Sequence, residues 1–412
     1  TLCRDSMNLQ VEAELKDETK LVHGHRGPKM EKLDVRTVNP AIQRGSTYLY
    51  DSMPHMIEAK SMAADMGIAS YGISGGDITL HWQEAFCAIE NGYRGVAVNS
   101  GMLACSLPLL ALLKHGDHVL MVDSVYGPVR TFCDGYLPRI GVEVTYYDPL
   151  LTIDELEQLR QDNTTVLYLE TPGSVTFEMQ DIPALAAWAK DRGVKTIIDN
   201  TWATGLYFKP LDHGIDISTH AATKYMCGHS DVISGAIVCN KDTAEQVEET
   251  RNLLGLAVPP DEAYAGLRGL RTMAVRLPVH WQNGLKLAEY MTTRDEVSNV
   301  LHPALEQDPG YAIWSRDFAG ASGLFSVVLR SDISWDEMNV FLEALKLYGI
   351  GFSWGGFESL CVWQNPKAIR TGSQWPRAGI SSGQVLRFHA GLEDADDLIE
   401  DVDQAFHAMK KA

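Results

Sequence analysis

Positive charge is scarce in this 412-residue sequence: 35 Lys and Arg residues stand against 54 Asp and Glu residues, a net charge of −19. This deficit argues against binding to a nucleic-acid backbone or an anionic membrane surface, because both are negatively charged. No apolar run is long enough to cross a bilayer. The first residues also lack the basic and apolar regions of a secretory signal. We therefore expect a cytoplasmic protein without nucleic acid or membrane as partner.

Cysteines are few and scattered. There are seven, an odd number, and no two of them form a CxxC pair. The 13 histidines likewise show no metal-ligand spacing. These absences argue against a disulfide framework and a zinc site, and they are typical of a reducing compartment. We expect no metal.

Two nucleotide-binding signatures are missing as well. The pattern GxxxxGK[ST] does not occur, which excludes a P-loop. Gly72, Gly75 and Gly76 cluster, but they do not form GxGxxG after a strand. A nicotinamide- or flavin-binding fold therefore has no support.

The sequence has the composition of a globular protein, with 45% hydrophobic and 22% charged residues. Its length predicts two or three domains. Residues 1–75 are poor in long periodic runs, and we expect an arm that contacts a neighbouring subunit. Residues 76–270 alternate strand and helix patterns and are predicted to form a large domain. Residues 271–412 are predicted to form a smaller α+β domain.

Seven short apolar runs in the middle segment are typical of strands that are covered on both faces. They lie at 96–98, 119–122, 142–147, 166–169, 196–198, 215–218 and 236–238. Helical stretches separate them, and the capping box at 152–155 begins one. The alternation predicts an α/β domain with a mostly parallel sheet, doubly wound with helices on both faces. Further helices are expected at about 261–293 and over the last residues, 395–409, and a second capping box lies at 334–337.

Asp199 and Lys224 suggest a cofactor chemistry. Asp199 directly follows a predicted strand, and ligands in open α/β sheets bind at the carboxyl ends of strands. Lys224 follows small residues and precedes a Gly-His-Ser-Asp segment, a setting less typical of a surface lysine. Pyridoxal phosphate needs a carboxylate that keeps its pyridine nitrogen protonated and a lysine that holds its aldehyde as an imine. The two residues in this order predict a site for that cofactor.

The cofactor phosphate and ring also need partners. Ser100, Gly101 and Met102 stand between a predicted strand and a predicted helix, where backbone N–H groups and the helix dipole attract an anion. Thr223 can add a hydroxyl group. Tyr126, after the next strand, can stack on the ring.

Residues 35–412 resemble the pyridoxal-phosphate enzymes of Cys/Met metabolism, the transsulfuration family, which have fold type I. The motifs are VNP at 38–40, QRGST at 43–47, SGM at 100–102, ETPGS at 170–174, DNTWA at 199–203, ATKY at 222–225, GHSD at 228–231, RGLRT at 268–272, SWGGFESL at 353–360, RFH at 387–389 and GLED at 391–394. Pro-Gly-Ser at 172–174 and Ser-Trp-Gly-Gly at 353–356 favour the branch of the bacterial-type cystathionine beta-lyases.

The resemblance implies a seven-stranded sheet and a role for each candidate residue. Lys224, Tyr126 and Tyr71 are the implied catalytic residues. The implied cofactor-binding residues are Lys224, Asp199, Tyr126, Gly101, Met102, Thr223 and Ser100. The implied substrate-binding residues are Arg387, which would bind the α-carboxylate, with Ser353, Trp354 and Tyr71.

The resemblance also implies a homodimer that shares its active sites, and we expect a homotetramer. Tyr71 would reach into the site of the neighbouring subunit. After Tyr71-Gly72 the family normally has an arginine that reaches the cofactor phosphate across the interface, and this sequence has Ile73. Either another group replaces that contact, the cofactor binds less tightly, or the site serves a different substrate.

The implied activity is β-elimination on cystathionine or a related sulfur amino acid, which gives a thiol, pyruvate and ammonia. Other reactions of the same family stay open: γ-elimination, γ-replacement, cysteine desulfhydration and racemisation. A homologue that binds the cofactor without catalysis is a third possibility, and the retention of Lys224, Asp199, Tyr126 and Arg387 together argues against it.

Overall fold

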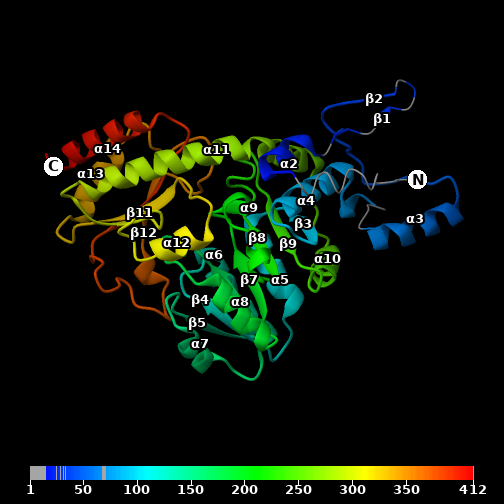
Figure 1. Ribbon diagram of the computed structural model, residues 1–412, viewed down its shortest axis with the longest axis horizontal. Helices are drawn as coiled ribbons and strands as arrows, with labels where there is room; N and C mark the ends of the chain where they lie inside the picture. Colours follow the sequence, from blue (N-terminus) through cyan, green and yellow to red (C-terminus); the bar gives the residue numbers. More distant parts are fainter. Residues whose placement is uncertain are drawn as a thin grey trace.

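The structure is a computed structural model that describes residues 15–24, 26–27, 29–30, 32, 34–66 and 71–411. Two sheets organise it, a seven-stranded one in the middle of the chain and a four-stranded one nearer the C-terminus. In Figure 1 the large sheet lies at the centre and the small sheet lies at the end of the molecule where the chain terminates. The predicted arm falls partly outside the described residues, since 1–14 and several positions up to 70 are not among them.

The large sheet has the strand order β3-β9-β8-β7-β6-β4-β5. Its strands are β3 (Arg94–Val98), β4 (His118–Val122), β5 (Glu143–Tyr147), β6 (Thr164–Glu170), β7 (Lys195–Asp199), β8 (Ile217–His220) and β9 (Gly235–Cys239). Neighbours from β8 to β5 run parallel, and β9 runs antiparallel to both β3 and β8. The predicted mostly parallel seven-stranded α/β sheet is confirmed.

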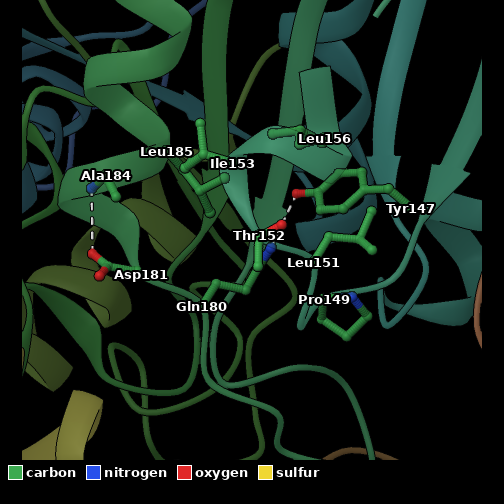
Figure 2. Close-up of a pocket in the computed structure, with 10 residues that line it drawn as sticks. All are labelled: Tyr147, Pro149, Leu151, Thr152, Ile153, Leu156, Gln180, Asp181, Ala184 and Leu185. Carbon is green, nitrogen blue, oxygen red and sulfur yellow. Dashed lines mark hydrogen bonds between the residues drawn. The ribbon is translucent and has the colours of Figure 1, made fainter. Parts of the chain in front are cut away.

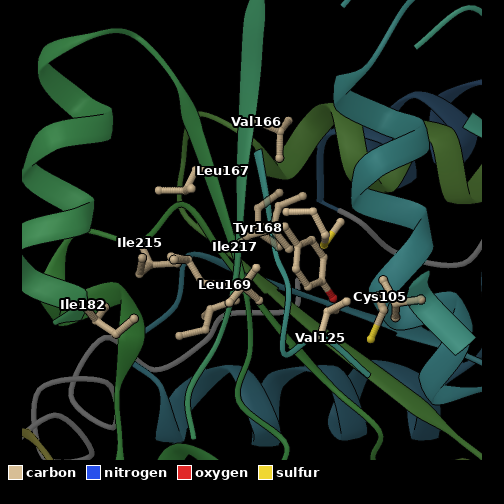
Figure 3. Packing of buried hydrophobic residues seen from close by; sticks show 14 of the residues in the cluster. Cys105, Val125, Val166, Leu167, Tyr168, Leu169, Ile182, Ile215 and Ile217 are labelled. Carbon is tan, nitrogen blue, oxygen red and sulfur yellow. The ribbon is translucent and has the colours of Figure 1, made fainter. Parts of the chain in front are cut away.

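Apolar runs form these strands because helices cover both faces of the sheet and leave little surface for polar side chains. Residues 166–169 of β6 are fully buried. Figure 3 shows them between Ile182 and Cys105, which lie in helices on opposite sides. The helices and 3-10 turns around this sheet are α4 (Asp77–Ile89), α5 (Gly101–Leu112), α6 (Gly127–Gly135), η2 (Leu137–Ile140), α7 (Ile153–Leu159), α8 (Ile182–Asp191), α9 (Thr204–Tyr207), η3 (Pro210–His213) and α10 (Ala244–Leu253).

The small sheet is antiparallel, in the order β10-β11-β13-β12. Its strands are β10 (Val297–Leu301), β11 (Leu324–Leu329), β12 (Leu360–Gln364) and β13 (Val385–His389). The long helix α11 (Pro260–Thr292) leads to it, and α12 (Tyr311–Asp317), α13 (Trp335–Ala344), η4 (Pro366–Ala368) and α14 (Ala395–Met409) complete this half. A separate buried cluster joins the small sheet to α13 and α14.

Two helices, α7 and α13, begin at the capping boxes that the sequence predicts. Both predicted capping boxes form: Thr152 with Glu155 at α7, and Ser334 with Glu337 at α13. Before α4, the chain forms α2 (Asp17–His23), β1 (Lys29–Met30), β2 (Val35–Arg36), α3 (Met53–Met66) and η1 (Gly72–Ser74). Among the described helices, none is both long and apolar enough to span a membrane.

Candidate active site

Most of the predicted site residues, Tyr71 excepted, gather near the carboxyl ends of the central parallel strands, where open α/β sheets bind ligands. Asp199 is the last residue of β7, and its register partner Glu170 is the last residue of β6. Tyr126 lies in the loop after β4, and Lys224 lies in the turn after β8. Because β4, β6, β7 and β8 are consecutive neighbours in the sheet, segments that are distant in the sequence meet at this edge.

Asp199 is buried and held by three donors. Its Oδ1 accepts hydrogen bonds from the backbone N–H of Thr201 at 2.9 Å and from the Thr201 hydroxyl at 2.5 Å. Its Oδ2 accepts one from the Cys105 thiol of α5 at 3.4 Å. These bonds fix the carboxylate at the strand end without a neighbouring cation in direct contact among the described residues. The geometry suits a carboxylate whose remaining capacity pairs with a protonated ring nitrogen.

Lys224 contacts the loop that precedes β12. Its Nζ donates a hydrogen bond to Ser353 Oγ at 2.5 Å and lies 5.4 Å from the centre of the Trp354 ring. The backbone packs just as closely: a Cβ on Gly355, which has φ +81°, would lie 2.9 Å from Tyr225 N and 3.1 Å from Lys224 Cα. Only glycine lets the two segments approach so far.

Burial lowers the pKa of Lys224 to about 8, and the nearby Arg387 guanidinium adds to this effect, whereas Asp199 acts in the opposite direction. An amine with this pKa is uncharged in a substantial fraction of molecules near neutral pH. It is therefore suited to attack an aldehyde and to accept a proton.

The N-terminus of α5 offers an anion site beside the lysine turn. Ser100 caps the helix by accepting a hydrogen bond from the Leu103 N–H at 3.2 Å. Gly101 and Met102 are the first two residues of α5, and their N–H groups have no partner within the helix. Gly101 packs on Ala221, because a Cβ at Gly101 would lie 2.5 Å from the Ala221 Cβ.

Thr223 is held next to this helix end. Its hydroxyl donates to the carbonyl of Ser234 at 3.1 Å and accepts from the Ser234 N–H at 3.0 Å. The hydroxyl thus has one further acceptor position at most, and its place is set by the backbone of Ser234.

Tyr126 precedes α6, and its ring is 42% exposed in the single chain. The backbone N–H of Tyr126 donates to Glu170 Oε2 at 2.7 Å. Burial raises the pKa of Glu170 well above its ordinary value, and the adjacent Asp199 charge adds to this, while the bond from Tyr126 opposes it. Glu170 therefore fixes the backbone from which the tyrosine ring projects.

Arg387 lies on β13, and its Nη2 donates to the carbonyl of Ser353 at 3.3 Å. Burial lowers the pKa of Arg387 to about 10, against the effects of Tyr126 and Cys361. Ser353 has a left-handed backbone with φ +81°, which is strained for a residue with a side chain. The strained loop thus holds Ser353 between Lys224 and Arg387.

Tyr71 stands apart from this set in the single chain. It is 54% exposed and immediately precedes η1, where the Gly72 N–H donates to the carbonyl of Ser46 in the arm at 2.9 Å. Ile73 is also exposed, and its Cδ1 lies near Gly255. The reach of Tyr71 into a second subunit stays a prediction.

Three contributors were not singled out from the sequence: Cys105 and Thr201, which bind Asp199, and Glu170, which binds the Tyr126 backbone. Thr201 and Glu170 lie inside recognised motifs, so their position was a usable signal. Cys105 carried none, because it looks like one apolar residue in a buried helix.

Taken together, these residues fit pyridoxal phosphate: an amine of lowered pKa, a fixed carboxylate and a helix N-terminus with free N–H groups converge at one sheet edge. The described residues hold no cluster of three or more His, Cys, Asp or Glu side chains that could bind a metal ion. A separate hollow of about 200 Å³, shown in Figure 2, is lined by residues of the β5–α7 loop, α7 and α8. It shares no residue with the candidate site.

Comparison with solved structures agrees with this fold. The cystathionine gamma synthase of Xanthomonas oryzae pv. oryzae, solved in complex with aminoacrylate and cysteine, superposes with a TM-score of 0.85. The two are 28% identical, with 96% of this chain and 99% of the other covered. The fold and the site thus define a pyridoxal-phosphate enzyme.

The family can be stated more closely. The sequence profile of the Cys/Met metabolism PLP-dependent enzymes matches residues 18–407, and the chain belongs to this family. It is 41% identical over 400 residues to cystathionine beta-lyase MetC of Escherichia coli (strain K12), covering 96% of this chain and 99% of that protein. It is also 34% identical over 377 residues to an L-alanine/L-glutamate racemase of Wolbachia pipientis wMel, covering 90% and 92%. The expected fold type and cofactor are confirmed.

Proposed function

We propose that the protein is a carbon–sulfur lyase that catalyses β-elimination on cystathionine or a related sulfur amino acid. The products are a thiol, pyruvate and ammonia. The observation that carries the proposal is the contact chain from Lys224 through Ser353 to Arg387. Ser353 contacts both Lys224, a base of lowered pKa, and Arg387, whose guanidinium can bind a carboxylate. Removal of a proton from the Cα of an amino acid requires both groups close together.

The residues divide between cofactor and substrate. Asp199 would pair with the ring nitrogen, Tyr126 would stack on the ring, and Lys224 would hold the aldehyde. Ser100, Gly101 and Met102 would hold the phosphate, and Thr223 would join them by turning its hydroxyl proton from the Ser234 carbonyl to a phosphate oxygen. Bound pyridoxal phosphate supplies an electron sink for the pair left on Cα when the proton departs.

The chain itself orients the substrate and moves the proton. Arg387 binds the α-carboxylate through its planar fork and fixes the Cα–H bond relative to the ring. Lys224 Nζ, free once the substrate amine has displaced it from the aldehyde, accepts the Cα proton, and Ser353 Oγ at 2.5 Å orients that nitrogen. Trp354 and Tyr71 line the side where the sulfur leaves. Loss of the thiolate from Cβ leaves a three-carbon unit that hydrolyses to pyruvate and ammonia.

The same residues can serve other reactions of the family, because all of them begin with a proton removed from Cα. Among the relatives are a beta-lyase and a racemase, and the solved neighbour is a gamma synthase. The departure at Ile73 is the feature that favours a changed substrate. The keto acid released separates the candidates: pyruvate for β-elimination, 2-oxobutyrate for γ-elimination and none for racemisation.

The site is proposed to be completed by a second copy of the chain. Tyr71 is exposed here, and Tyr71 of the second copy would supply one side of the site. We propose a homodimer that shares its active sites, two of which form a tetramer, with residues 1–75 as the arm, 76–270 as the cofactor domain and 271–412 as the small domain. A cytoplasmic location is consistent with the six described cysteines, all of which are free.

The deciding experiment incubates the cofactor-loaded protein with L-cystathionine and identifies the keto acid. Pyruvate with homocysteine supports the proposal. A Lys224→Ala variant should lose turnover and the visible absorbance of the bound cofactor, whereas the exposed Lys190→Ala variant should lose neither. Pyruvate release that survives Lys224→Ala would refute the assignment of the base, and 2-oxobutyrate alone would refute β-elimination.

A further inference from the structure

One segment of the small-sheet half is attached to the large sheet by side-chain hydrogen bonds and one buried tryptophan. It joins β12 to β13, and we name residues 365–384 the strap. Both ends of the strap lie in the sheet that carries Arg387: β12 pairs with β13, and Val362 is the register partner of Arg387. The middle of the strap reaches the large sheet as well, since Trp375 belongs to a buried cluster that contains strand residues of the large sheet together with Leu324 and Val385 of the small one.

The first attachment is a buried carboxylate that follows β4. Asp123 Oδ2 accepts a hydrogen bond from the Ser373 hydroxyl at 2.5 Å, and its Oδ1 accepts one from the Thr371 N–H at 3.1 Å. Arg130 of α6 forms an ion pair with the same carboxylate, and its Nη1 donates to the Thr371 hydroxyl at 3.1 Å. Asp123 precedes Tyr126 by one short turn, so this attachment lies at the base of the loop that carries the tyrosine.

The second attachment is Glu178, in the segment after β6. Arg370 Nη1 donates to Glu178 Oε1 at 2.9 Å and Arg370 Nη2 donates to Oε2 at 3.1 Å, a fork-to-carboxylate pair. The two side chains are only 2% and 6% exposed. Arg377 Nε adds a third bond to Glu178 at 3.0 Å and reaches Asp148 with its two terminal nitrogens.

The two attachments belong to one block of the large domain. The N–H of Ser174 donates to the carbonyl of Ser124 at 2.8 Å, and the Gly173 N–H donates to the carbonyl of Glu178 at 2.9 Å. Glu170 binds the Tyr126 N–H in the same block. The strap therefore runs from β12 into the block that holds Tyr126 and returns to the sheet at β13, the strand of Arg387.

We propose that the strap positions Arg387 relative to Tyr126, with Arg370, Glu178 and Asp123 as positioning residues for binding of the substrate α-carboxylate. Buried ion pairs rarely improve stability over apolar packing, because both charges lose their hydration. A forked guanidinium–carboxylate pair does define distance and plane, which an apolar contact does not. The inference rests on the proposed role of Arg387 and deepens it.

The test compares two small amines that differ only in the carboxylate, glycine and glycinamide, titrated into the cofactor-loaded protein and followed by its visible absorbance. Arg370→Met keeps the length and packing of the side chain but removes the fork. We expect its affinity for glycine to fall about tenfold, as for a displacement of a bound group by a fraction of an ångström. Its affinity for glycinamide and for the cofactor should stay within about twofold of wild type.

Two controls frame this result. Arg387→Met should abolish the preference for glycine over glycinamide. Arg316→Met removes an exposed ion pair with Asp181 that also bridges the two halves of the molecule, with side chains 49% and 42% exposed. This variant should bind both ligands as wild type does.

A second variant tests the same proposal if Arg370→Met does not fold. Thr371→Val with Ser373→Ala removes the Ser373–Asp123 bond and the Arg130–Thr371 side-chain bond, and it leaves the bond from the Thr371 N–H to Asp123 and the Arg130–Asp123 pair in place. It should show the same selective loss for glycine. The proposed role of the strap would be refuted if both variants bound glycine as tightly as wild type does. It would also be refuted if they lost affinity for glycine and glycinamide equally. A selective loss of glycine affinity, in a protein that releases no pyruvate from cystathionine, would refute β-elimination and still support the positioning role of the strap. Normal glycine binding by Arg387→Met would refute both proposals.

Discussion

The lowered pKa of Lys224 makes a prediction about stability that needs no substrate. In the folded, cofactor-free protein its pKa is about 8, against an ordinary lysine value of 10.5. Between these two values the unfolded chain binds a proton on this side chain that the folded chain has released. Stability therefore rises with pH across this window, because ∂ΔG of unfolding/∂pH is positive wherever the unfolded state binds more protons.

The size of the effect follows from the two pKa values. A tenfold change in proton affinity is worth about 1.4 kcal/mol. The difference between the two pKa values therefore lowers the free energy of unfolding by roughly 3 kcal/mol at and below neutral pH. The free energy of unfolding rises by about 2 kcal/mol between pH 7 and pH 9.5, and the rest of the increase follows as the pH passes the pKa of the unfolded chain. Lys224→Met removes the titrating group and keeps an unbranched side chain of similar length.

Urea unfolding of cofactor-free wild type and Lys224→Met at pH 7, 8, 9 and 9.5 measures the effect. The stability of wild type relative to the variant should rise by about 2 kcal/mol over this range. Other groups titrate in both proteins and cancel in the difference. Lys190→Met, a change at an exposed lysine of α8, is the matched control and should give a flat difference. Parallel profiles for wild type and Lys224→Met would refute the burial of a neutral lysine.

Three further variants test the surroundings of the cofactor. Gly101→Ala places a Cβ 2.5 Å from that of Ala221; we expect a loss of about 1–3 kcal/mol in unfolding free energy and weaker cofactor binding, partly restored by Ala221→Gly. Thr201→Val removes the hydroxyl that binds Asp199 and accepts the Ala221 N–H; calorimetry should show a cost of about 1–3 kcal/mol, and wild-type stability would contradict the role of that hydroxyl. Ile73→Arg should tighten cofactor binding roughly tenfold in equilibrium dialysis, because it adds a charge-assisted contact to the phosphate. The neutral Ile73→Gln should leave the affinity unchanged. Equal affinities of the two variants would show that another group already fills that position.

The sequence predicted the large sheet well because its signals are local. Each strand is a short apolar run, such as 166–169, whose burial on both faces selects apolar residues at every position. The capping boxes at Thr152 and Ser334 are equally local, since each joins residues three positions apart. The antiparallel direction of β9 was not predicted, because strand direction depends on the connection and not on the composition of the strand.

The sequence also predicted the cofactor and the two residues at the centre of the candidate site. Asp199 and Lys224 each follow a strand, and the motifs around them are contiguous, so the cofactor could be inferred before any tertiary contact was known. Only the tertiary structure decided how these residues are supported. Cys105 meets Asp199 across 94 positions and Arg370 meets Glu178 across 192. Such contacts depend on how strands and helices pack, and packing is set by the whole chain and not by the residues around either partner.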